Sequence, residues 1–489
     1  MPTVIENVQG AIRILLLACA VWCMGACSLL DSRQPADTAA AQLQQCEQEL
    51  RQLQRAIKRA GVNDAQYRRV RDFPTYRSNR FWSSFAADKL NQQQQQHWRR
   101  QLHTLGMDSL HIEARNLPTA AVPFSPDTFF ARCDKPLWQA SLLQPLTAEQ
   151  LQIPDSYSSL QRFFGLYALT KKGALGSIRQ YQQEMRERIS GDTVFDPGGS
   201  ILYLPQISGQ ATATATAIDD IRLTLDPLGI PQFSAEELRE LLQRHAPQWQ
   251  VQQRSDADRI GAARWQGAMR RIDAEQPVVY AYPSYVRSRQ GVLLQLNYTA
   301  WFSARPKPDR FDWYGGALDG LLWRVTLRTD GGVLFYDSIH PCGCYHTLHR
   351  PQDSTLDIPA GADEPLLVFD SLLSDRHANP VLLVQADTHY LLKVQAQPEP
   401  APRRMEYRLA PYDNLRSLPA PEADGARHRN WFDPDGLIAA SARFERFFLW
   451  PLGVPSAGAM RQQGHHAIAF VGRRHFDEAW LEDLLGTAG

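Results

Sequence analysis

The pattern of hydrophobic and polar positions changes twice along the chain. After an uncharged N-terminal run, hydrophobic residues recur at helical spacings of three and four through residues 42–61 and 65–190. From residue 191 to 410 the pattern changes to runs rich in β-branched and aromatic residues, which are typical of strands. Residues 411–489 mix both patterns. We therefore predict an α+β fold: a helical N-terminal region, an antiparallel-rich β domain and a short α/β C-terminal segment.

The helix predicted over residues 42–61 has a heptad pattern that ends at Gly61. Its apolar positions are Leu43, Cys46, Leu50, Leu53, Ile57 and Ala60. The pattern fits either a coiled coil or a single amphipathic helix that lies on the body of the protein. In a parallel homodimer formed through residues 42–61, Cys46 would lie on the seam and could cross-link the two copies.

The β-rich region contains two sharp local signals. The runs WRVTLR and VLFYDSIH flank TDGG, which predicts a hairpin. In SAEELRELLQRHAP, Ser234 and Glu237 form a capping box, which predicts the start of a helix. Near the C-terminus, HHAIAFVG is a strand candidate and DEAWLEDLL a short helix. Strands follow one another without regular intervening helices, which argues against a doubly wound parallel sheet.

The N-terminal apolar run, residues 14–27 (ILLLACAVWCMGAC), follows Arg13 and contains no charge. It is short for a membrane span, which needs about 17–25 residues, and fits the hydrophobic region of a signal peptide. Its end, MGAC, resembles the lipobox of bacterial lipoproteins. The resemblance implies a signal peptide over 1–26, a lipidated Cys27, a tether over 27–41, and an outer-membrane lipoprotein facing the periplasm. The alternative is an uncleaved anchor that extends to Leu30.

Composition narrows the class of protein further. The 489 residues correspond to roughly two to four structural units, and the 44% hydrophobic content is ample for a core. Lys+Arg and Asp+Glu are equal at 52 each, so no overall positive field attracts nucleic acid. The chain has no phosphate-binding glycine loop, no H-E-x-x-H and no G-x-S-x-G, so we infer no nucleotide.

The candidate chemistry is concentrated in HPCGCYH, residues 340–346. On a flat strand its alternate residues would spread over about 20 Å, too far for one metal ion. Pro341 and Gly343 interrupt the strand and allow the chain to curl. The curled loop would offer a Cys₂His₂ set for Zn²⁺ or Cu⁺, although the spacing differs from that of common zinc modules. The four candidate metal ligands are His340, Cys342, Cys344 and His346.

Two other interpretations of the loop remain open. In the first, Cys342 and Cys344 form a disulfide, because an exported compartment favours disulfides and residues two apart can span one. Either cysteine could instead pair with Cys133, and Cys46 is the remaining candidate of the mature chain. In the second, the loop is simply packed and its thiols are free. A Cys344 nucleophile beside a histidine is a weaker idea, because such sites are recognised by geometry.

Further candidate residues lie outside the loop. Additional metal ligands could come from Asp337, His349, His465, His466, His475 and Asp319. An anion could be bound by Arg461, Arg473 and Arg474, although ordinary charged strand flanks explain the same pattern. In FDWYGGALDG, Trp313 and Tyr314 could line a cleft that binds a planar ligand, although a glycine-rich turn explains that stretch more cheaply.

These observations favour a lipid-anchored envelope protein with a binding or structural role, in which the Cys/His loop is a metal or disulfide site. One alternative is a periplasmic metal-dependent hydrolase that uses the loop, with Asp337 or Asp319 as acid or base. A structural metal site is closed by four protein ligands, whereas a catalytic site keeps a position for water. Another alternative is a coiled-coil scaffold built on residues 42–61. The sequence does not identify the ligand.

Overall fold

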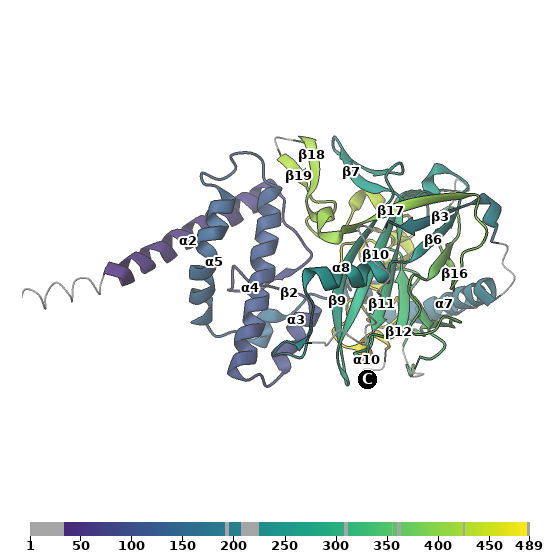
Figure 1. The fold of residues 1–489 in the computed structure, drawn as a ribbon, viewed down its shortest axis with the longest axis horizontal. Helices are drawn as coiled ribbons and strands as arrows, with labels where there is room; N and C mark the ends of the chain where they lie inside the picture. The colour runs from purple at the N-terminus through teal and green to yellow at the C-terminus, as the bar shows by residue number, and fades with distance from the viewer. Residues whose placement is uncertain are drawn as a thin grey trace, which may run out of the picture. The chain divides into compact units, whose positions relative to one another are not determined.

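The computed structural model describes residues 34–190, 195–206, 224–307, 312–354, 356–358, 363–423 and 426–486. The predicted signal peptide and the lipidation site at Cys27 lie outside these residues. The chain divides into two compact units. The first comprises Met1–Ala56 and Val122–Pro145, and the second comprises Ile57–Ala121 and Leu146–Gly489. Figure 1 shows the elements of both units.

The first unit is built on two helices, α2 (Gln34–Ala60), which continues into the second unit, and α5 (Pro126–Leu142). The helix α2 begins at Gln34, within the stretch predicted as a tether. A disulfide joins Cys46 to Cys133 within the chain. Because Cys46 is bonded to Cys133, the prediction of an intermolecular cross-link at Cys46 is wrong. The suggested pairing of Cys133 with a cysteine of the Cys/His loop is wrong for the same reason. A homodimer through residues 42–61 stays a prediction.

The second unit contains an 11-stranded mixed sheet in the order β14-β13-β12-β11-β10-β9-β17-β3-β6-β15-β16. In chain order, the bounds of these strands are β3 (Ser200–Pro205), β6 (Gln248–Gln252), β9 (Val278–Ser288), β10 (Gly291–Arg305), β11 (Gly316–Leu327), β12 (Val333–Ile339), β13 (Thr347–Arg350), β14 (Leu367–Asp370), β15 (Val381–Val384), β16 (Leu391–Gln395) and β17 (Arg403–Pro411). The consecutive strands β9 to β13 pair antiparallel with one another, as do β3 with β6 and β15 with β16. The pairs β13–β14, β15–β6, β17–β3 and β17–β9 are parallel.

The second unit also contains helices and small two-stranded sheets. The helices are α3 (Arg80–Ser84), α4 (Gln92–Arg115), α6 (Ser159–Phe164), α7 (Tyr167–Ser190), α8 (Ala235–Arg244), α9 (Arg446–Leu449) and α10 (Leu481–Leu484). The small sheets pair β1 (Arg68–Arg69) with β2 (Arg77–Ser78), β4 (Thr224–Leu225) with β5 (Pro231–Gln232), β7 (Ala262–Gln266) with β8 (Met269–Asp273), and β18 (Leu418–Ala423) with β19 (Ala426–Arg429). The prediction of an α+β protein is confirmed.

Both local signals in the β-rich region are confirmed. The TDGG turn joins β11 to β12, and the two strands pair antiparallel from Leu322–Ile339 to Leu327–Val333. Helix α8 begins after Ser234, whose hydroxyl accepts the Glu237 amide while the Glu237 carboxylate accepts the Ser234 amide. These elements follow from local sequence because both the turn and the cap are satisfied by neighbouring residues.

The hydrophobic core occupies both faces of the sheet. In β10, Leu294, Leu296 and Tyr298 contribute to one cluster with residues of α8, whereas Leu293 contributes to a second cluster on the other face. The Tyr298 hydroxyl donates to the Leu242 carbonyl at 2.8 Å, which fixes α8 against the sheet. Residues of a strand alternate between faces, so a strand buried on both faces has the near-continuous apolar run seen in GVLLQLNYTAWF.

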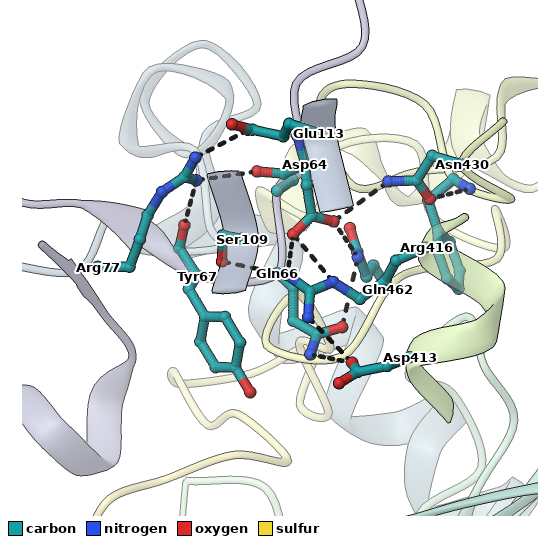
Figure 2. A network of polar contacts seen from close by, with 12 residues as sticks. Asp64, Gln66, Tyr67, Arg77, Ser109, Glu113, Asp413, Arg416, Asn430 and Gln462 are labelled. Carbon is teal, nitrogen blue, oxygen red and sulfur yellow. Dashed lines mark hydrogen bonds and ion pairs between the residues drawn. The ribbon is translucent and has the colours of Figure 1, made fainter. Parts of the chain in front are cut away.

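A buried polar network joins the segment after α2 to the C-terminal part of the second unit (Figure 2). The Arg416 guanidinium donates to Asp64 Oδ2 from Nη2 at 2.6 Å and from Nε at 3.1 Å. Asn430 and Gln462 donate to the other carboxylate oxygen of Asp64, at 3.1 and 2.8 Å. Glu113 on α4 accepts from the Asp64 amide at 2.9 Å. Both carboxylate oxygens of Asp64 are paired within the chain, so we interpret the network as structural.

The C-terminal segment differs from its prediction in one respect. HHAIAFVG is not a strand, and the structure has only an isolated bridge there, between Ala467 and His475. Its backbone donors bind side chains instead: the Glu364 carboxylate accepts from the amides of Phe470 and Val471 at 2.6 and 2.9 Å. Of the helix predicted over DEAWLEDLL, only Leu481–Leu484 is helical, as α10. Within the described residues, no helix is both long enough and apolar enough to cross a membrane.

Candidate functional site

The Cys/His loop, residues 340–346, is the turn between β12 and β13. The His340 amide donates to the Cys344 carbonyl at 3.0 Å, and the Gly343 amide donates to the His340 carbonyl at 2.8 Å. Gly343 has φ +91°, and a Cβ atom there would lie 2.4 Å from the Ala467 carbonyl oxygen. Only glycine fits both the conformation and the space. The loop therefore curls, as the Pro341 and Gly343 positions predicted.

The two histidines of the loop point to different carboxylates. His340 Nδ1 lies 3.3 Å from Asp319 Oδ1, whereas His346 Nε2 lies 3.1 Å from Asp337 Oδ2. Asp337 is also bound by Arg324, at 2.8 and 2.5 Å. Within the described residues, no three or more His, Cys, Asp or Glu side chains are arranged as metal ligands. The structure thus does not bring the four predicted ligands to one point, and Zn²⁺ or Cu⁺ binding stays a prediction.

The two thiols of the loop lie against each other without a disulfide between them. The Cys344 amide donates to Cys342 Sγ at 3.4 Å. A hydrogen bond with Cys342 and burial together raise the pKa of the Cys344 thiol well above its ordinary value. A protonated thiol is a poor nucleophile. This geometry therefore favours free, packed thiols over a cysteine nucleophile.

A buried chain of alternating carboxylates and imidazoles extends from His340 into the core. His389 Nδ1 lies 2.8 Å from Asp319 Oδ2, and His389 Nε2 lies 3.4 Å from Asp258 Oδ1. Burial lowers the pKa of His389, but its two carboxylate partners outweigh burial, so the pKa is raised. Burial raises the pKa of Asp319, but His340 and His389 hold it well below the usual range. Asp319 is therefore held in its ionised form between the two imidazoles.

A cavity of about 710 Å³ lies beside the loop. The loop contributes Cys342, Gly343, Cys344, Tyr345 and His346 to its lining, and α7 contributes a second wall. Most of the remaining wall is apolar and comes from the segments after β13 and around α9: Leu366, Leu367, Phe448, Leu449, Val454, Ile468 and Phe470. The volume lies within the range of about 300–1,000 Å³ that is usual for small-molecule sites.

One end of the cavity is polar. Tyr390 and Tyr181 reach it, and the two rings flank Tyr345 at centroid distances of 4.7 and 5.6 Å. The Tyr181 hydroxyl is buried and has no hydrogen-bond partner among the described residues. Arg305 lies behind the tyrosines, donates to the Tyr390 hydroxyl at 3.2 Å and covers its ring. A buried hydroxyl without a partner is unfavourable, so this end suits a ligand that can form hydrogen bonds.

Glu445 is the most perturbed carboxyl of the cavity lining. Burial raises its pKa to about 7, although Arg305 and Arg443 oppose the shift. A carboxyl with a pKa near neutrality can donate or accept a hydrogen bond, and groups of this kind are frequent at functional sites. Glu445 therefore gives the polar end a group whose charge changes near neutral pH.

The C-terminal histidines do not reach the loop, although Arg461 does. Arg461 Nε donates to the Cys342 carbonyl at 3.1 Å. His465 Nε2 lies 2.9 Å from the Ala65 carbonyl, and His475 lies between Glu478 and Asp155, at 2.8 and 3.1 Å. Burial lowers the pKa of His466 to about 3, so this ring is neutral. These histidines have separate local roles.

The other predicted residues are also dispersed. Burial lowers the pKa of His349 to about 3, and its ring stacks on Phe369. Arg474 donates to the Glu364 carbonyl, whereas Arg473 pairs with Asp155 at 2.7 Å. The three predicted anion-binding arginines thus have different partners within the chain. Of the aromatic pair in FDWYGGALDG, Tyr314 lines the cavity, and Trp313 stacks on Phe448 at 4.0 Å.

Sequence reasoning missed the residues that complete the polar end of the cavity: Tyr181, Arg305, Tyr390 and Glu445. Only Glu445 carries a signal in the sequence, because it is the single acidic residue between Asp435 and Asp477.

Comparison with known proteins gives no match: no family model, curated protein or solved structure is significantly similar to the chain.

Thiol counting and metal analysis test the loop directly. In mature protein denatured without reductant, we expect two titratable thiols, because Cys342 and Cys344 are free and Cys46 is bonded to Cys133. The variant C342S/C344S is expected to have none. A count of zero in the wild type would instead indicate a Cys342–Cys344 disulfide. About one metal ion per chain, lost in the variant, would support the metal prediction.

Proposed function

We propose that the chain is a lipid-anchored binding protein of the bacterial envelope, and that its ligand occupies the cavity beside the Cys/His loop. The envelope location, with the protein on the outer membrane facing the periplasm, is supported by the resemblance of residues 1–30 to a lipoprotein signal. The binding role rests on one observation. The curled loop, which sequence patterns single out, forms one wall of the cavity of about 710 Å³.

The lining indicates the chemistry of the ligand. Apolar side chains such as Leu367, Phe448 and Ile468 form most of the wall, whereas Glu445 and the tyrosine hydroxyls are gathered at the polar end. A mainly apolar cavity with a few convergent polar groups favours a molecule whose apolar and polar parts are separated in the same way. We therefore propose a ligand with an extended apolar part and one hydrogen-bonding group.

Filling the cavity is the most direct test. Ser177 lies on the cavity side of α7, so Ser177→Trp places an indole in the space that the ligand needs. With the apolar fluorophore 1-anilinonaphthalene-8-sulfonate as probe, we expect the wild type to bind saturably. The S177W variant is expected to bind at least about tenfold more weakly, because overlap with the indole costs at least about 1.4 kcal/mol.

The matched control is Arg179→Trp, which adds the same side chain to an exposed position of α7 that does not line the cavity. Its affinity for the probe is expected to stay within about twofold of the wild type. Equal binding by all three proteins would place the probe elsewhere and contradict the assignment of the cavity as the ligand site. Identical thermal unfolding of S177W and R179W would exclude a loss of fold as the cause.

A further inference from the structure

Large apolar side chains are exposed together on α6 and the start of α7. Phe163 is 74% exposed, and its neighbours in this stretch are 64 to 68% exposed. These neighbours are Leu160, Phe164, Leu166 and Leu169. Single exposed apolar residues are ordinary, whereas a contiguous group of them marks an interaction surface.

Helix α9 and the 3₁₀ turn after it, Trp450–Leu452, extend the same surface. Phe444, Phe447, Phe448 and Trp450 are 39 to 61% exposed. The two parts are packed together, because Arg162 of α6 donates to the Leu452 carbonyl at 2.9 Å and the Ser158 amide donates to the Gly453 carbonyl at 2.7 Å. We call these nine exposed side chains of α6, α7 and α9–Trp450 the apolar surface.

The backbone between α6 and α7 indicates that this surface is not an accident of folding. Leu166 has φ +49°, a left-handed conformation that costs a residue with a Cβ roughly 1–2 kcal/mol. Glycine would adopt it without that cost. A leucine that is both strained and 64% exposed contributes little to stability in the free protein. Its apolar side chain is useful only if something apolar covers it.

The charges around the apolar surface are basic. Residues 156–183 contain Arg162, Lys171, Lys172 and Arg179 and no acidic residue. On α9, Arg446 is exposed, whereas the adjacent Glu445 is buried in the cavity lining. A surface of Phe, Leu and Trp bordered by Lys and Arg has the composition of helices that lie in the interface of an anionic bilayer. Each such basic residue near the surface contributes about 1 kcal/mol.

We propose that the apolar surface docks on an anionic lipid bilayer, with the aromatic and leucine side chains in the headgroup region and the basic residues on lipid phosphates. Phe448 belongs both to this surface and to the cavity lining, and α7 contributes to both. Docking therefore brings the rim of the cavity to the bilayer. Resting on the proposed binding function, this identifies the ligand as an amphiphile taken from the lipid.

Hydrogen exchange on the full chain tests the docking, because it reports on α6, α7 and α9 separately from any N-terminal anchor. We expect amides of residues 159–172 and 444–452 to exchange at least fivefold more slowly on vesicles of phosphatidylglycerol and phosphatidylethanolamine than on phosphatidylcholine alone. The variant F163S/F164S should lose this protection, because both side chains are exposed and removable without loss of the core.

Matched variants keep the result interpretable. L225S/L372S removes two exposed leucines outside the apolar surface, and R68E/K89E changes the same charge as K171E/K172E at exposed positions elsewhere. Both controls should keep the protection, whereas K171E/K172E should weaken it. Exchange that is equal on all vesicles, or slowed by protein concentration without lipid, would overturn the proposal. The second outcome would assign the surface to another copy of the chain. The S177W variant tests ligand binding in the cavity separately, so the docking proposal and the binding proposal can fail independently.

Discussion

Replacing Arg416 by methionine is expected to destabilise the protein by about 3–5 kcal/mol, the usual cost of removing one partner of a buried ion pair. Arg416 and Asp64 are both almost fully buried, and the pair is joined by two hydrogen bonds. The pKa of Asp64 is raised by burial, but Arg416 and its other donors outweigh this, so the pKa lies below its usual value. Without the guanidinium, a carboxylate is left in the interior without its main counter-charge. Chemical denaturation at pH 7 measures the loss.

The control uses the same guanidinium. Arg416 Nη1 also donates to Asp413, whose side chain is 61% exposed. Exposed ion pairs contribute about 0–1 kcal/mol, so Asp413→Asn should change the free energy of unfolding by less than about 1 kcal/mol. If D413N lost as much stability as R416M, the network would depend on the exposed Arg416–Asp413 pair and not on the buried Arg416–Asp64 pair drawn in Figure 2.

Replacing Glu445 by glutamine is expected to stabilise the protein at neutral and alkaline pH. The folded-state pKa of about 7 lies above the ordinary value of 4.5. Between pH 4.5 and 7 the folded state therefore holds a proton that the unfolded state has released, and the stability of the wild type falls as pH rises. Each pKa unit is worth about 1.4 kcal/mol, which makes the full effect on the order of 3 kcal/mol.

Glutamine does not titrate, so E445Q should lack this decline. Near pH 4 the difference in stability between wild type and E445Q should be smallest, and it should grow in favour of E445Q until about pH 7 and then stay constant. Glu240→Gln, at an exposed position of α8, is the control and should follow the wild type. Parallel stability profiles for wild type and E445Q would contradict the raised pKa. The pKa of Glu445 also depends on the charges of Arg305, Arg443, Asp319 and Asp312. Its shift therefore reports on the electrostatics around the polar end of the cavity.

Local sequence rules predicted the elements whose hydrogen bonds are satisfied locally. The Ser234 cap and the TDGG turn bind residues that are near in sequence, and both are confirmed. The strand predicted for HHAIAFVG is wrong because its amides bind Glu364 and the Tyr157 hydroxyl, which come from distant segments. The sequence of an apolar run does not show which hydrogen-bond acceptors its backbone amides will bind in the fold.

In the candidate site, too, local sequence predicts the backbone conformation but not the contacts with distant segments. The curl of the Cys/His loop follows from Pro341 and Gly343, whereas the partners of its side chains do not. His340 and His346 are the first and last of four alternating candidate ligands, yet they contact different carboxylates, Asp319 and Asp337. The cavity is completed by Tyr181, Tyr390 and Glu445, which come from three separate stretches of the chain. Only the folded sheet brings these stretches together.

The Cys46–Cys133 bond has a mechanical consequence for a protein held at its N-terminus. Tension between the anchor proposed at Cys27 and the C-terminal body enters the chain before residue 46, crosses the sulfur bridge and continues from residue 133. The intervening stretch, which carries Asp64 and Glu113, is bridged by this bond and therefore shares the pull with a second covalent path. For a chain anchored at Cys27, the bond thus lowers the part of the load that passes through the buried network of Arg416.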